Sequence, residues 1–366
     1  MRTFFLLIIY FYSAYCANAQ VSVVDARRIE NTLYNVLDKN VGQMFSFAKV
    51  TTYLDGSKMD KSKCDNIIYL EYKDEYFKRS HEGGLNIRWF GCNETRLDNQ
   101  LIINQVLARY KTAYIPAGIF KFSGTITVPE NAQLFGAGYT SQLQLISKSP
   151  VNAISLFRRG SLEQFKLDCS ASDMDLSAGI LVNSWADVQS RTGESRVQHV
   201  QIVGNYPQLQ GVGIKLEVTR AGSEDYSVIA FCKFLDIDIY GFRDGIFCDV
   251  QYRKGKNISY INANIFENII LHRCLRPLRL VNMAENADIV SGKSAIASNY
   301  FRNLVIQHVV GNYPAIFVDG GIFNDISAHV IDWTGNHVES TTTSSNNSFQ
   351  ILPSVQARIK LNSPTK

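Results

Sequence analysis

The stretch Gly213-Ile214-Lys215-Leu216-Glu217 starts with a glycine and then alternates apolar and polar side chains. This alternation is typical of a β-strand that buries one face. The position of Ile214 is matched at residues 180, 246, 278 and 316, with successive spacings of 34, 32, 32 and 38 residues. We call these stretches the marker strands; the others are Gly179-Ile180-Leu181-Val182-Asn183, Gly245-Ile246-Phe247-Cys248-Asp249, Pro277-Leu278-Arg279-Leu280-Val281 and Ala315-Ile316-Phe317-Val318-Asp319.

A second apolar strand precedes most of the marker strands. It is seen at Phe234–Ile239, Phe266–Leu271, Phe301–Ile306 and Phe323–Ile326. A repeat of this length is typical of a solenoid, a propeller or an array. A propeller blade needs four strands, whereas each repeat here offers two strands and no helical period. The pattern therefore predicts a coiled parallel β-helix. The second strands share a polar position, and its residues are predicted to form a column of stacked turn residues: Asp236, Asn268, Asn303 and Asp325.

The rest of the chain gives weaker signals. Asp25 to Leu37 has apolar residues at helical spacing, and Asp98 is a suitable N-cap for a helix that ends near Tyr110. Short strands are expected at Thr112–Ile115, Gly124–Val128 and Gln133–Phe135. After Trp333 the repeat is expected to stop. The remainder is predicted to be a polar linker from Thr341 to Ser348, followed by one or two closing strands between Phe349 and Leu361.

Composition places the chain among ordinary globular proteins. Of 366 residues, 46% are hydrophobic and 19% are charged, which excludes a disordered chain. The formal net charge of +4 is too weak to indicate nucleic-acid binding. Arg2, the apolar run Phe4–Tyr15 and Ala17-Asn18-Ala19 predict a secretory signal peptide over residues 1–19. That run is too short to span a bilayer, so we expect a periplasmic or secreted protein without a membrane span.

Six cysteines remain after Cys16, and export makes disulfides feasible. Cys64 and Cys92 are the pair to test. Three others are interpreted as buried small apolar residues: Cys169, Cys248 and Cys274.

Four motifs resemble a known family: Asn86-Ile87-Arg88-Trp89-Phe90-Gly91-Cys92, Asp98–Leu107, Ala113–Phe120 and Leu134-Phe135-Gly136-Ala137-Gly138. They are similar to the segment with which the β-helix begins in the pectate-lyase-like right-handed β-helix superfamily. Within it, they resemble in particular phage tailspike depolymerases and their exported bacterial relatives. The resemblance covers about Val24 to Asp332. It implies an all-β fold: a single-stranded right-handed parallel β-helix (pectin-lyase-like), with a small mixed N-terminal region and an N-terminal capping helix.

Four segments are expected from these observations. They are a signal peptide (1–19), a small tailspike-like region (20–90), the β-helix (91–338), and a polar linker with closing strands (339–366). The resemblance also implies a polysaccharide substrate and a homotrimer, although no trimerisation segment stands out. The catalytic signatures of polygalacturonases and the calcium site of pectate lyases are absent from the sequence.

Stacking the marker strands in register predicts two outward columns. One holds Leu181, Lys215, Phe247, Arg279 and Phe317; the other holds Asn183, Glu217, Asp249, Val281 and Asp319. Glu217 and Asp249 would then lie side by side on neighbouring coils. Paired carboxylates at such a separation suit glycosidic hydrolysis, because mutual repulsion favours the protonated form of one of them.

Further residues complete the candidate site. Asp244 matches the Asp-Gly-Ile portion of a polygalacturonase motif, so the resemblance implies a catalytic role for it beside Glu217 and Asp249. The residues expected to bind substrate supply charge, an aromatic face and polar groups: Lys215, Phe247, Arg276, Arg279, Asp319 and Asn183. The histidines lack metal-ligand spacing, and we expect neither metal nor cofactor.

Three functions follow as hypotheses. The first is an exported depolymerase that hydrolyses an acidic glycan, bacterial or pectin-like, through the carboxylate pair. The second is a polysaccharide lyase in which Lys215, Arg276 and Arg279 carry the reaction. The third is a carbohydrate-binding surface protein without catalysis. An unsaturated, ultraviolet-absorbing product would distinguish the lyase from the hydrolase.

Overall fold

The computed structural model describes residues 21–22, 27–185, 194–219, 226–251, 258–283, 294–307, 313–352 and 358–361. The chain divides into two compact units. Unit 1 comprises residues 1–93 and 112–114, and unit 2 comprises residues 94–111 and 115–366. The signal peptide expected over residues 1–19 lies outside the described residues. No helix in the described ranges is long and apolar enough to cross a membrane.

Unit 1 is built around a small antiparallel sheet. Its strands are β1 (Val21–Ser22), β2 (Arg27–Ile29), β3 (Thr32–Asp38), β4 (Gln43–Lys49), β5 (Tyr69–Tyr72) and β6 (Glu75–Arg79), and its 3₁₀ turns are η2 (Lys61–Lys63) and η3 (Ile87–Phe90). The sheet buries an apolar core of Leu33, Val36, Phe47, Leu70 and Phe77.

The helix expected over residues 25–37 is wrong, because β2 and β3 occupy this part of the chain. A register shift in β3 lies between Leu33 and Val36, where Asn35 adopts a φ of 56°. The extra residue turns both apolar side chains to the same face although they are three positions apart. This bulge therefore produces the spacing that resembled a helix.

A buried ion pair ties unit 1 together. Arg79 Nη1 lies 2.6 Å from Asp38 Oδ2, and both side chains are almost fully buried. The guanidinium carbon lies 3.5 Å from the ring centroid of Phe45 and 4.0 Å from that of Trp89. Burial lowers the pKa of Arg79, and Asp38 opposes that shift. The flanking rings replace part of the lost hydration with cation–π contact.

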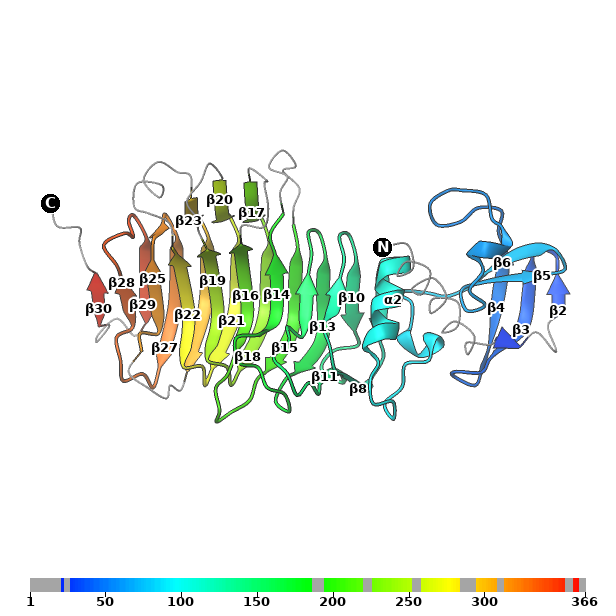
Figure 1. Cartoon of the computed structure of the whole chain (residues 1–366), viewed down its shortest axis with the longest axis horizontal. Helices are drawn as coiled ribbons and strands as arrows, with labels where there is room; N and C mark the ends of the chain where they lie inside the picture. Colours follow the sequence, from blue (N-terminus) through cyan, green and yellow to red (C-terminus); the bar gives the residue numbers. More distant parts are fainter. Residues whose placement is uncertain are drawn as a thin grey trace, which may run out of the picture. The chain divides into compact units, whose positions relative to one another are not determined.

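Unit 2 stacks parallel strands in three sheets (Figure 1). Sheet A contains the marker strands in the order β30-β28-β25-β22-β19-β16-β14-β12-β9. Their bounds are β9 (Ile126–Val128), β12 (Ile154–Leu156), β14 (Ala178–Asn183), β16 (Val212–Thr219), β19 (Asp244–Gln251), β22 (Arg276–Asn282), β25 (Ile316–Asp319), β28 (Val338–Ser340) and β30 (Ile359–Leu361).

Sheet B contains the second strand of each coil, and sheet C is short. Sheet B includes β10 (Gln133–Gly136), β13 (Ser161–Asp168), β15 (Arg196–Val203), β18 (Lys233–Tyr240), β21 (Ile265–His272), β24 (Tyr300–Gln307), β27 (Asp325–Ile331) and β29 (Ser348–Leu352). Sheet C is β17 (Tyr226–Ala230), β20 (Ile258–Asn262), β23 (Ser294–Ala297) and β26 (Gly321–Ile322). The first coils also include β7 (Thr112–Ile115), β8 (Gly118–Phe122) and β11 (Ser141–Leu145).

The predicted register of the marker strands is confirmed. Ile214 pairs with Ile180 on one side and Ile246 on the other, and the series continues through Leu278 to Ile316. All five side chains are fully buried. The structure is thus the all-β parallel β-helix that the repeat predicted, with one strand of each of these coils in sheet A.

The glycine that opens the marker has a steric cause. A Cβ atom built on Gly213 would lie 2.7 Å from the carbonyl oxygen of Gly245 and 2.4 Å from Ile239 Cγ2. A Cβ atom on Gly245 would lie 2.6 Å from the carbonyl oxygen of Pro277. Successive coils approach too closely for a side chain at these two positions, whereas the later marker strands open with Pro277 and Ala315.

The polar column of sheet B is confirmed for three of its four members. Asn303 donates to Asn268 over 3.1 Å, and Asn268 donates to Asp236 over 3.0 Å. All three adopt a left-handed backbone with φ between 53° and 56°. The column ends before Asp325, because Phe301 pairs with Ile326 and not with Phe323, which brings Asp325 opposite Tyr300.

A buried asparagine ladder was not predicted. Asn264 donates to Asn299 over 2.9 Å, Asn299 to Asn324 over 2.9 Å, and Asn324 to Asn347 over 3.0 Å. The same side chains donate to buried backbone carbonyls such as that of Ile261. The ladder satisfies the polar groups of the bends that lead into sheet B.

Three other expectations need correction or refinement. The capping helix α2 spans Gln100–Tyr110 with Asn99 at its N-cap, while Asp98 Oδ1 accepts from the Gln100 amide over 2.9 Å. The repeat does not stop after Trp333, because β28, β29 and β30 continue sheets A and B. The coils also contain a third strand, in sheet C, that the repeat pattern missed.

The cysteines separate into two groups. Cys169, Cys248 and Cys274 are buried as predicted, and Cys232 is buried with them. Burial raises the pKa of Cys232 and Cys274 to about 12, so these thiols are inert at neutral pH. Cys64 and Cys92 are not joined by a disulfide in this structure.

Candidate functional site

The outer face of sheet A brings the predicted site residues into two columns. Lys215 pairs with Phe247, and Phe247 with Arg279, on adjacent strands. Glu217 pairs with Asp249 in the second column. The structure therefore places the two carboxylates on neighbouring coils, as the repeat predicted.

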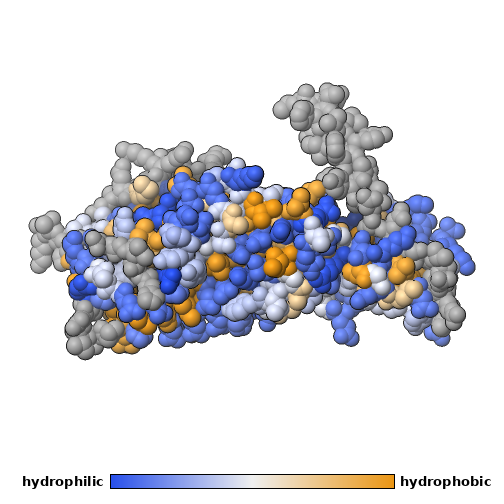
Figure 2. Space-filling view, turned by 90° about the horizontal axis from the view of Figure 1, so that it is seen from below, coloured by the Kyte–Doolittle hydropathy of each residue, from blue (hydrophilic) through white to orange (hydrophobic). Residues whose placement is uncertain are grey.

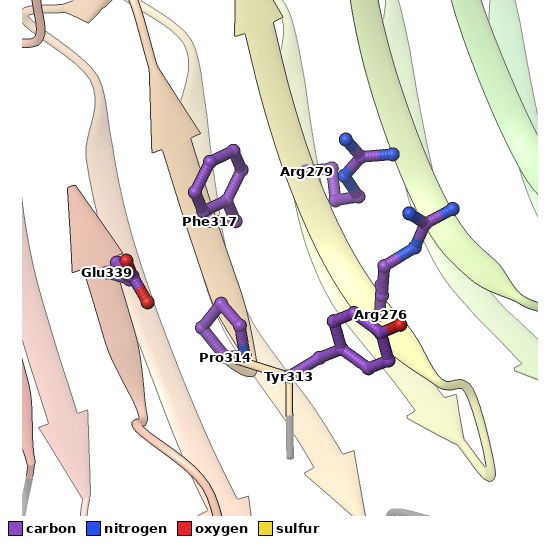
Figure 3. Close-up of a pocket in the computed structure, with 6 residues that line it drawn as sticks. All are labelled: Arg276, Arg279, Tyr313, Pro314, Phe317 and Glu339. Carbon is purple, nitrogen blue, oxygen red and sulfur yellow. The ribbon is translucent and has the colours of Figure 1, made fainter. Parts of the chain in front are cut away.

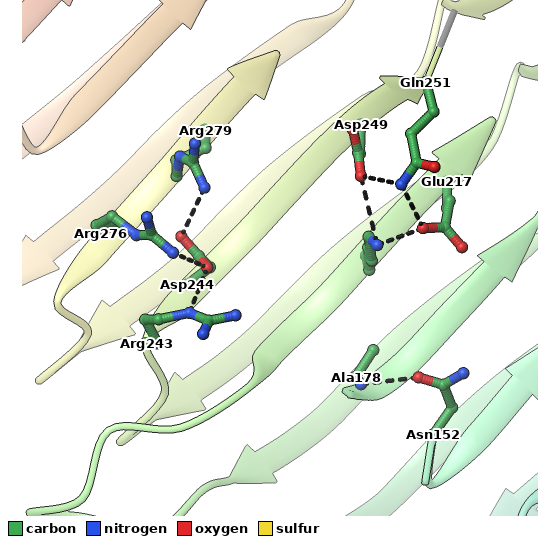
Figure 4. Close-up of polar contacts among 10 residues, drawn as sticks. Asn152, Ala178, Glu217, Arg243, Asp244, Asp249, Gln251, Arg276 and Arg279 are labelled. Carbon is green, nitrogen blue, oxygen red and sulfur yellow. Dashed lines mark hydrogen bonds and ion pairs between the residues drawn. The ribbon is translucent and has the colours of Figure 1, made fainter. Parts of the chain in front are cut away.

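Lys215 and Gln251 link the two carboxylates (Figure 4). Lys215 Nζ contacts Glu217 Oε1 and lies 3.4 Å from Asp249 Oδ2. Gln251 Nε2 donates to Glu217 Oε1 over 3.2 Å and to Asp249 Oδ2 over 3.0 Å. Because the two oxygens share one donor nitrogen, they lie at most about 6 Å apart, within reach of the separation in retaining glycosidases.

The two carboxylates differ in access to solvent. The Asp249 side chain is 7% exposed, whereas that of Glu217 is 23% exposed. Asp249 is thus the more rigidly held group, and Glu217 has the better route for proton exchange with water.

Phe247 lies between the cations of its column. Lys215 Nζ is 5.6 Å and Arg279 Cζ is 4.6 Å from its ring centroid. The ring separates the carboxylate pair from a cluster of arginines, and its half-buried position leaves an apolar surface between the two charged groups.

Asp244 is the centre of the arginine cluster. Arg276 Nη2 lies 2.6 Å and Arg243 Nε 3.2 Å from Asp244 Oδ2, and Arg279 Nη1 lies 3.5 Å from Oδ1 (Figure 4). The aspartate is 1% exposed, whereas the three arginines are about a quarter exposed. Burial lowers the pKa of Arg279, and Asp244 opposes that effect.

The cluster opens into a pocket of about 180 Å³ (Figure 3). Its lining combines two guanidinium groups, two rings, a proline and a carboxylate: Arg276, Arg279, Tyr313, Phe317, Pro314 and Glu339. Arg276 Cζ lies 5.9 Å from the ring centroid of Tyr313. The lining holds two guanidinium groups and one carboxylate, so Arg276 and Arg279 offer donors that suit an anionic group.

Two predicted binding residues are engaged elsewhere. Asn183 donates to Ser155 Oγ over 2.7 Å and to the carbonyl oxygen of Leu156 over 3.2 Å. Asp319 accepts from Thr341 over 2.6 Å and from Thr343 over 2.9 Å. Both lie in the column of Glu217 and Asp249, but their hydrogen bonds go to the neighbouring coils on the sides away from the two carboxylates.

Sequence reasoning missed several residues of this face. Gln251 was detectable, because a period of two from Phe247 and Asp249 points it outward on the same strand. Glu339 continues the column of Phe317, but β28 lacks the opening glycine. Tyr313 and Pro314 come from the segment before β25 and carry no repeat signal.

Comparisons with known proteins bear on the fold. No family model and no curated protein matches the chain. The enzymatically active domain of tailspike protein 2 from bacteriophage CBA120 matches with a TM-score of 0.52 and 13% identity, over 99% of this chain and 58% of that one. The full-length tailspike protein 2 from Escherichia coli O157:H7 bacteriophage CAB120 matches with a TM-score of 0.51 and 13% identity, over 94% of this chain and 51% of that one.

The chain thus spans about half the length of these tailspike structures. A match at 13% identity supports a shared fold but not a shared activity. The sheets supply independent evidence, because their strands follow one another in parallel and in register. The chain therefore has the right-handed parallel β-helix fold and is similar in that fold to the phage tailspike domains.

Proposed function

We propose that this protein is a polysaccharide depolymerase that hydrolyses glycosidic bonds of an acidic glycan on the outer face of sheet A. The observation that carries the proposal is the pair Glu217 and Asp249, whose oxygens share the donors Lys215 and Gln251. The fold supports it, since the similar tailspike structure is described as an enzymatically active domain.

The geometry suggests a role for each carboxylate. Asp249, nearly buried and held by two donors, would attack the anomeric carbon. Glu217, the more exposed group, would protonate the leaving oxygen and later activate water. The upper bound of about 6 Å between their nearest oxygens is compatible with a retaining mechanism and a covalent glycosyl intermediate. Lys215 would hold both carboxylates in orientation.

The pocket suggests how an acidic sugar is recognised. Arg276 and Arg279 would receive the carboxylate of the substrate, and Tyr313 and Phe317 would contact the sugar ring. Asp244 would position the arginines instead of transferring protons, because its carboxylate is almost fully buried beneath them.

A lyase is the second candidate, favoured by one observation. Arg276 and Arg279 both line the pocket, where their charged guanidinium groups could neutralise a uronate carboxylate. That neutralisation would make the proton next to the carboxylate easier to remove by a basic side chain. Lys215 is less suited as the base, because its ammonium group is directed at two carboxylates.

The test is to incubate the protein with a panel of acidic polysaccharides and follow chain length and near-ultraviolet absorbance. Hydrolysis shortens the polysaccharide without forming an unsaturated product that absorbs in the near ultraviolet. Glu217→Gln and Asp249→Asn should each abolish this shortening. Glu267→Gln, on sheet B, is the matched control and should leave the rate unchanged. Shortening with absorbance selects the lyase, and binding without shortening selects a binding protein.

Localisation and assembly remain predictions that belong to this proposal. A depolymerase of external glycans would act in the periplasm or outside the cell. Determining the N-terminal residue of the exported protein would test the predicted cleavage of the signal peptide. A homotrimer would be tested by the mass of the protein in solution.

A further inference from the structure

The outer face of sheet B carries three aromatic rings in a row. Tyr240 on β18 pairs in register with His272 on β21, and their ring centroids lie 5.3 Å apart. Tyr206 follows β15, and its ring centroid lies 6.0 Å from that of Tyr240. Tyr206 is 37% exposed, and the other two rings are partly exposed. Together they form a continuous aromatic surface, which we call the aromatic row.

The backbone fixes Tyr206 against Tyr240. A Cβ atom on Gly204 would lie 2.6 Å from the carbonyl oxygen of Gly241, so the two segments are in close contact. Gly241 has a φ of 75°, and a Cβ atom there would lie 3.2 Å from Tyr206 Cβ. Arg273 Cζ lies 4.7 Å from the Tyr206 ring centroid. The ring is therefore preorganised, which lowers the entropy cost of binding to it.

Carboxylates lie at the edge of the aromatic row. Asp238 points outward two residues before Tyr240 and is only partly exposed; burial raises its pKa. Burial also raises the pKa of Tyr139, with smaller contributions from the charges of Asp238 and Asp236. Asp236 Oδ2 lies 3.2 Å from His199 Nε2. Asp238 therefore presents a carboxylate on the same outward face of β18 as the Tyr240 ring.

We propose that the aromatic row and Asp238 form a second polysaccharide-binding surface, for a neutral stretch of glycan. The C–H face of a sugar ring packs on aromatic rings, and its hydroxyl groups can donate to the carboxylate at the edge. Arg273 is balanced here by Asp236 and Asp238, so the surface lacks the positive charge that would favour a polyanion. Because the rings follow successive coils, an extended polymer can contact all of them.

This surface is independent of the proposed catalytic face. It lies on sheet B and shares no residue with the Glu217 and Asp249 pair. It would hold a long substrate, or anchor the protein to a neutral polymer, whichever reaction sheet A performs. Its test therefore uses binding alone.

Affinity electrophoresis in native gels containing dextran, galactomannan or hydroxyethylcellulose would measure this binding. We expect at least one polymer to retard the protein. Tyr206→Ala and Tyr240→Ala should each weaken retardation on the order of tenfold, about 1.4 kcal/mol. Tyr300→Ala is the control, because Tyr300 is 39% exposed on the same sheet and lies outside the row. Asp238→Asn should weaken retardation without lowering the melting temperature.

Three results would overturn the proposal. They are the absence of retardation by all three polymers, an equal loss in Tyr300→Ala, and a loss in Glu217→Gln as large as in Tyr240→Ala. The last result would mean that a single surface on sheet A binds the glycan. A hydrolysis assay that fails on acidic polymers would leave this inference standing, so the two proposals can fail separately.

Discussion

Arg276 donates to Asp244 over 2.6 Å, and this aspartate is almost completely buried while the arginine reaches the pocket surface. The pair connects the core of the β-helix to its candidate binding face. A carboxylate below the surface fixes the direction of guanidinium groups that would otherwise sample many rotamers. The arrangement explains why three arginines can gather on one face of a nearly neutral protein.

Asp244→Asn should destabilise the protein. The substitution removes the negative charge that compensates three arginines. Breaking a buried ion pair costs about 3–5 kcal/mol of the free energy of unfolding. We expect about 2–3 kcal/mol here, because the arginines are partly exposed. Urea unfolding would measure the change. Asp175→Asn removes the exposed partner of Arg243 and should change stability by less than about 0.5 kcal/mol. Equal stabilities for the two variants would contradict this account.

Arg276→Gln should weaken binding of the acidic substrate more than it slows turnover. The substitution removes a guanidinium from the pocket but leaves Glu217 and Asp249 in place. We expect KM to rise on the order of tenfold, since a charge-assisted hydrogen bond contributes about 1.5–3 kcal/mol. Steady-state kinetics would show it. A fall in kcat with an unchanged KM would place Arg276 in the chemical step.

Asn299→Ala should be among the most destabilising substitutions of a polar residue. Asn299 accepts from the backbone and side chain of Asn264 and donates to Asn324 and to the Ile261 carbonyl. Each buried group left unsatisfied costs about 1–3 kcal/mol, so we expect a total loss of at least about 3 kcal/mol.

Asn303→Gly is the control for the ladder. Asn303 belongs to the exposed column and has a φ of 53°, which glycine adopts without strain. Thermal unfolding should show a much smaller effect than for Asn299→Ala. Similar losses for the two variants would mean that burial of the ladder contributes little.

Acid should loosen the last coil through His337. Its Nδ1 accepts from the Arg358 amide over 3.1 Å, and burial together with the Arg358 charge lowers the pKa of His337. The unfolded chain therefore takes up a proton first, near pH 6.5. The contribution of neutral His337 to the free energy of unfolding is present above that pH, and it is lost as the pH falls through the lower pKa that His337 has in the folded chain. The protection factors at residues 358–361, which already correct for the slower intrinsic exchange at lower pH, should fall from pH 7.5 to 5.5.

His337→Asn keeps an acceptor but cannot titrate. Exchange in this variant should therefore show only the intrinsic pH dependence. An unchanged response in the variant would assign the effect to another group.

The sequence predicted the coils but not all of their strands. Alternation around Ile214 was informative because one face of each marker strand is buried without exception. The false helix at residues 25–37 arose from a bulge, which cannot be distinguished from helical spacing in a short window. The coil that contains Val338 was missed because its second inward position is held by Ser340, where the neighbouring strand has Val318.

The candidate site was predictable only in part. Register alone brought Glu217 and Asp249 together, so period-two reasoning sufficed for them. The bridging by Lys215 and Gln251 depends on side-chain rotamers, and the pocket needs Tyr313 from a segment outside the sheet. The burial of Asp244 beneath three arginines also depends on how side chains of different coils pack, which no linear pattern encodes.

The most direct test of the central claim is the rate at which the protein shortens an acidic polysaccharide, measured for the unmodified protein and for Glu217→Gln, Asp249→Asn and Glu267→Gln. The account predicts shortening without unsaturated products, a loss of at least about 1000-fold in the first two variants, and an unchanged rate in the third. Full activity in both Glu217→Gln and Asp249→Asn would contradict it.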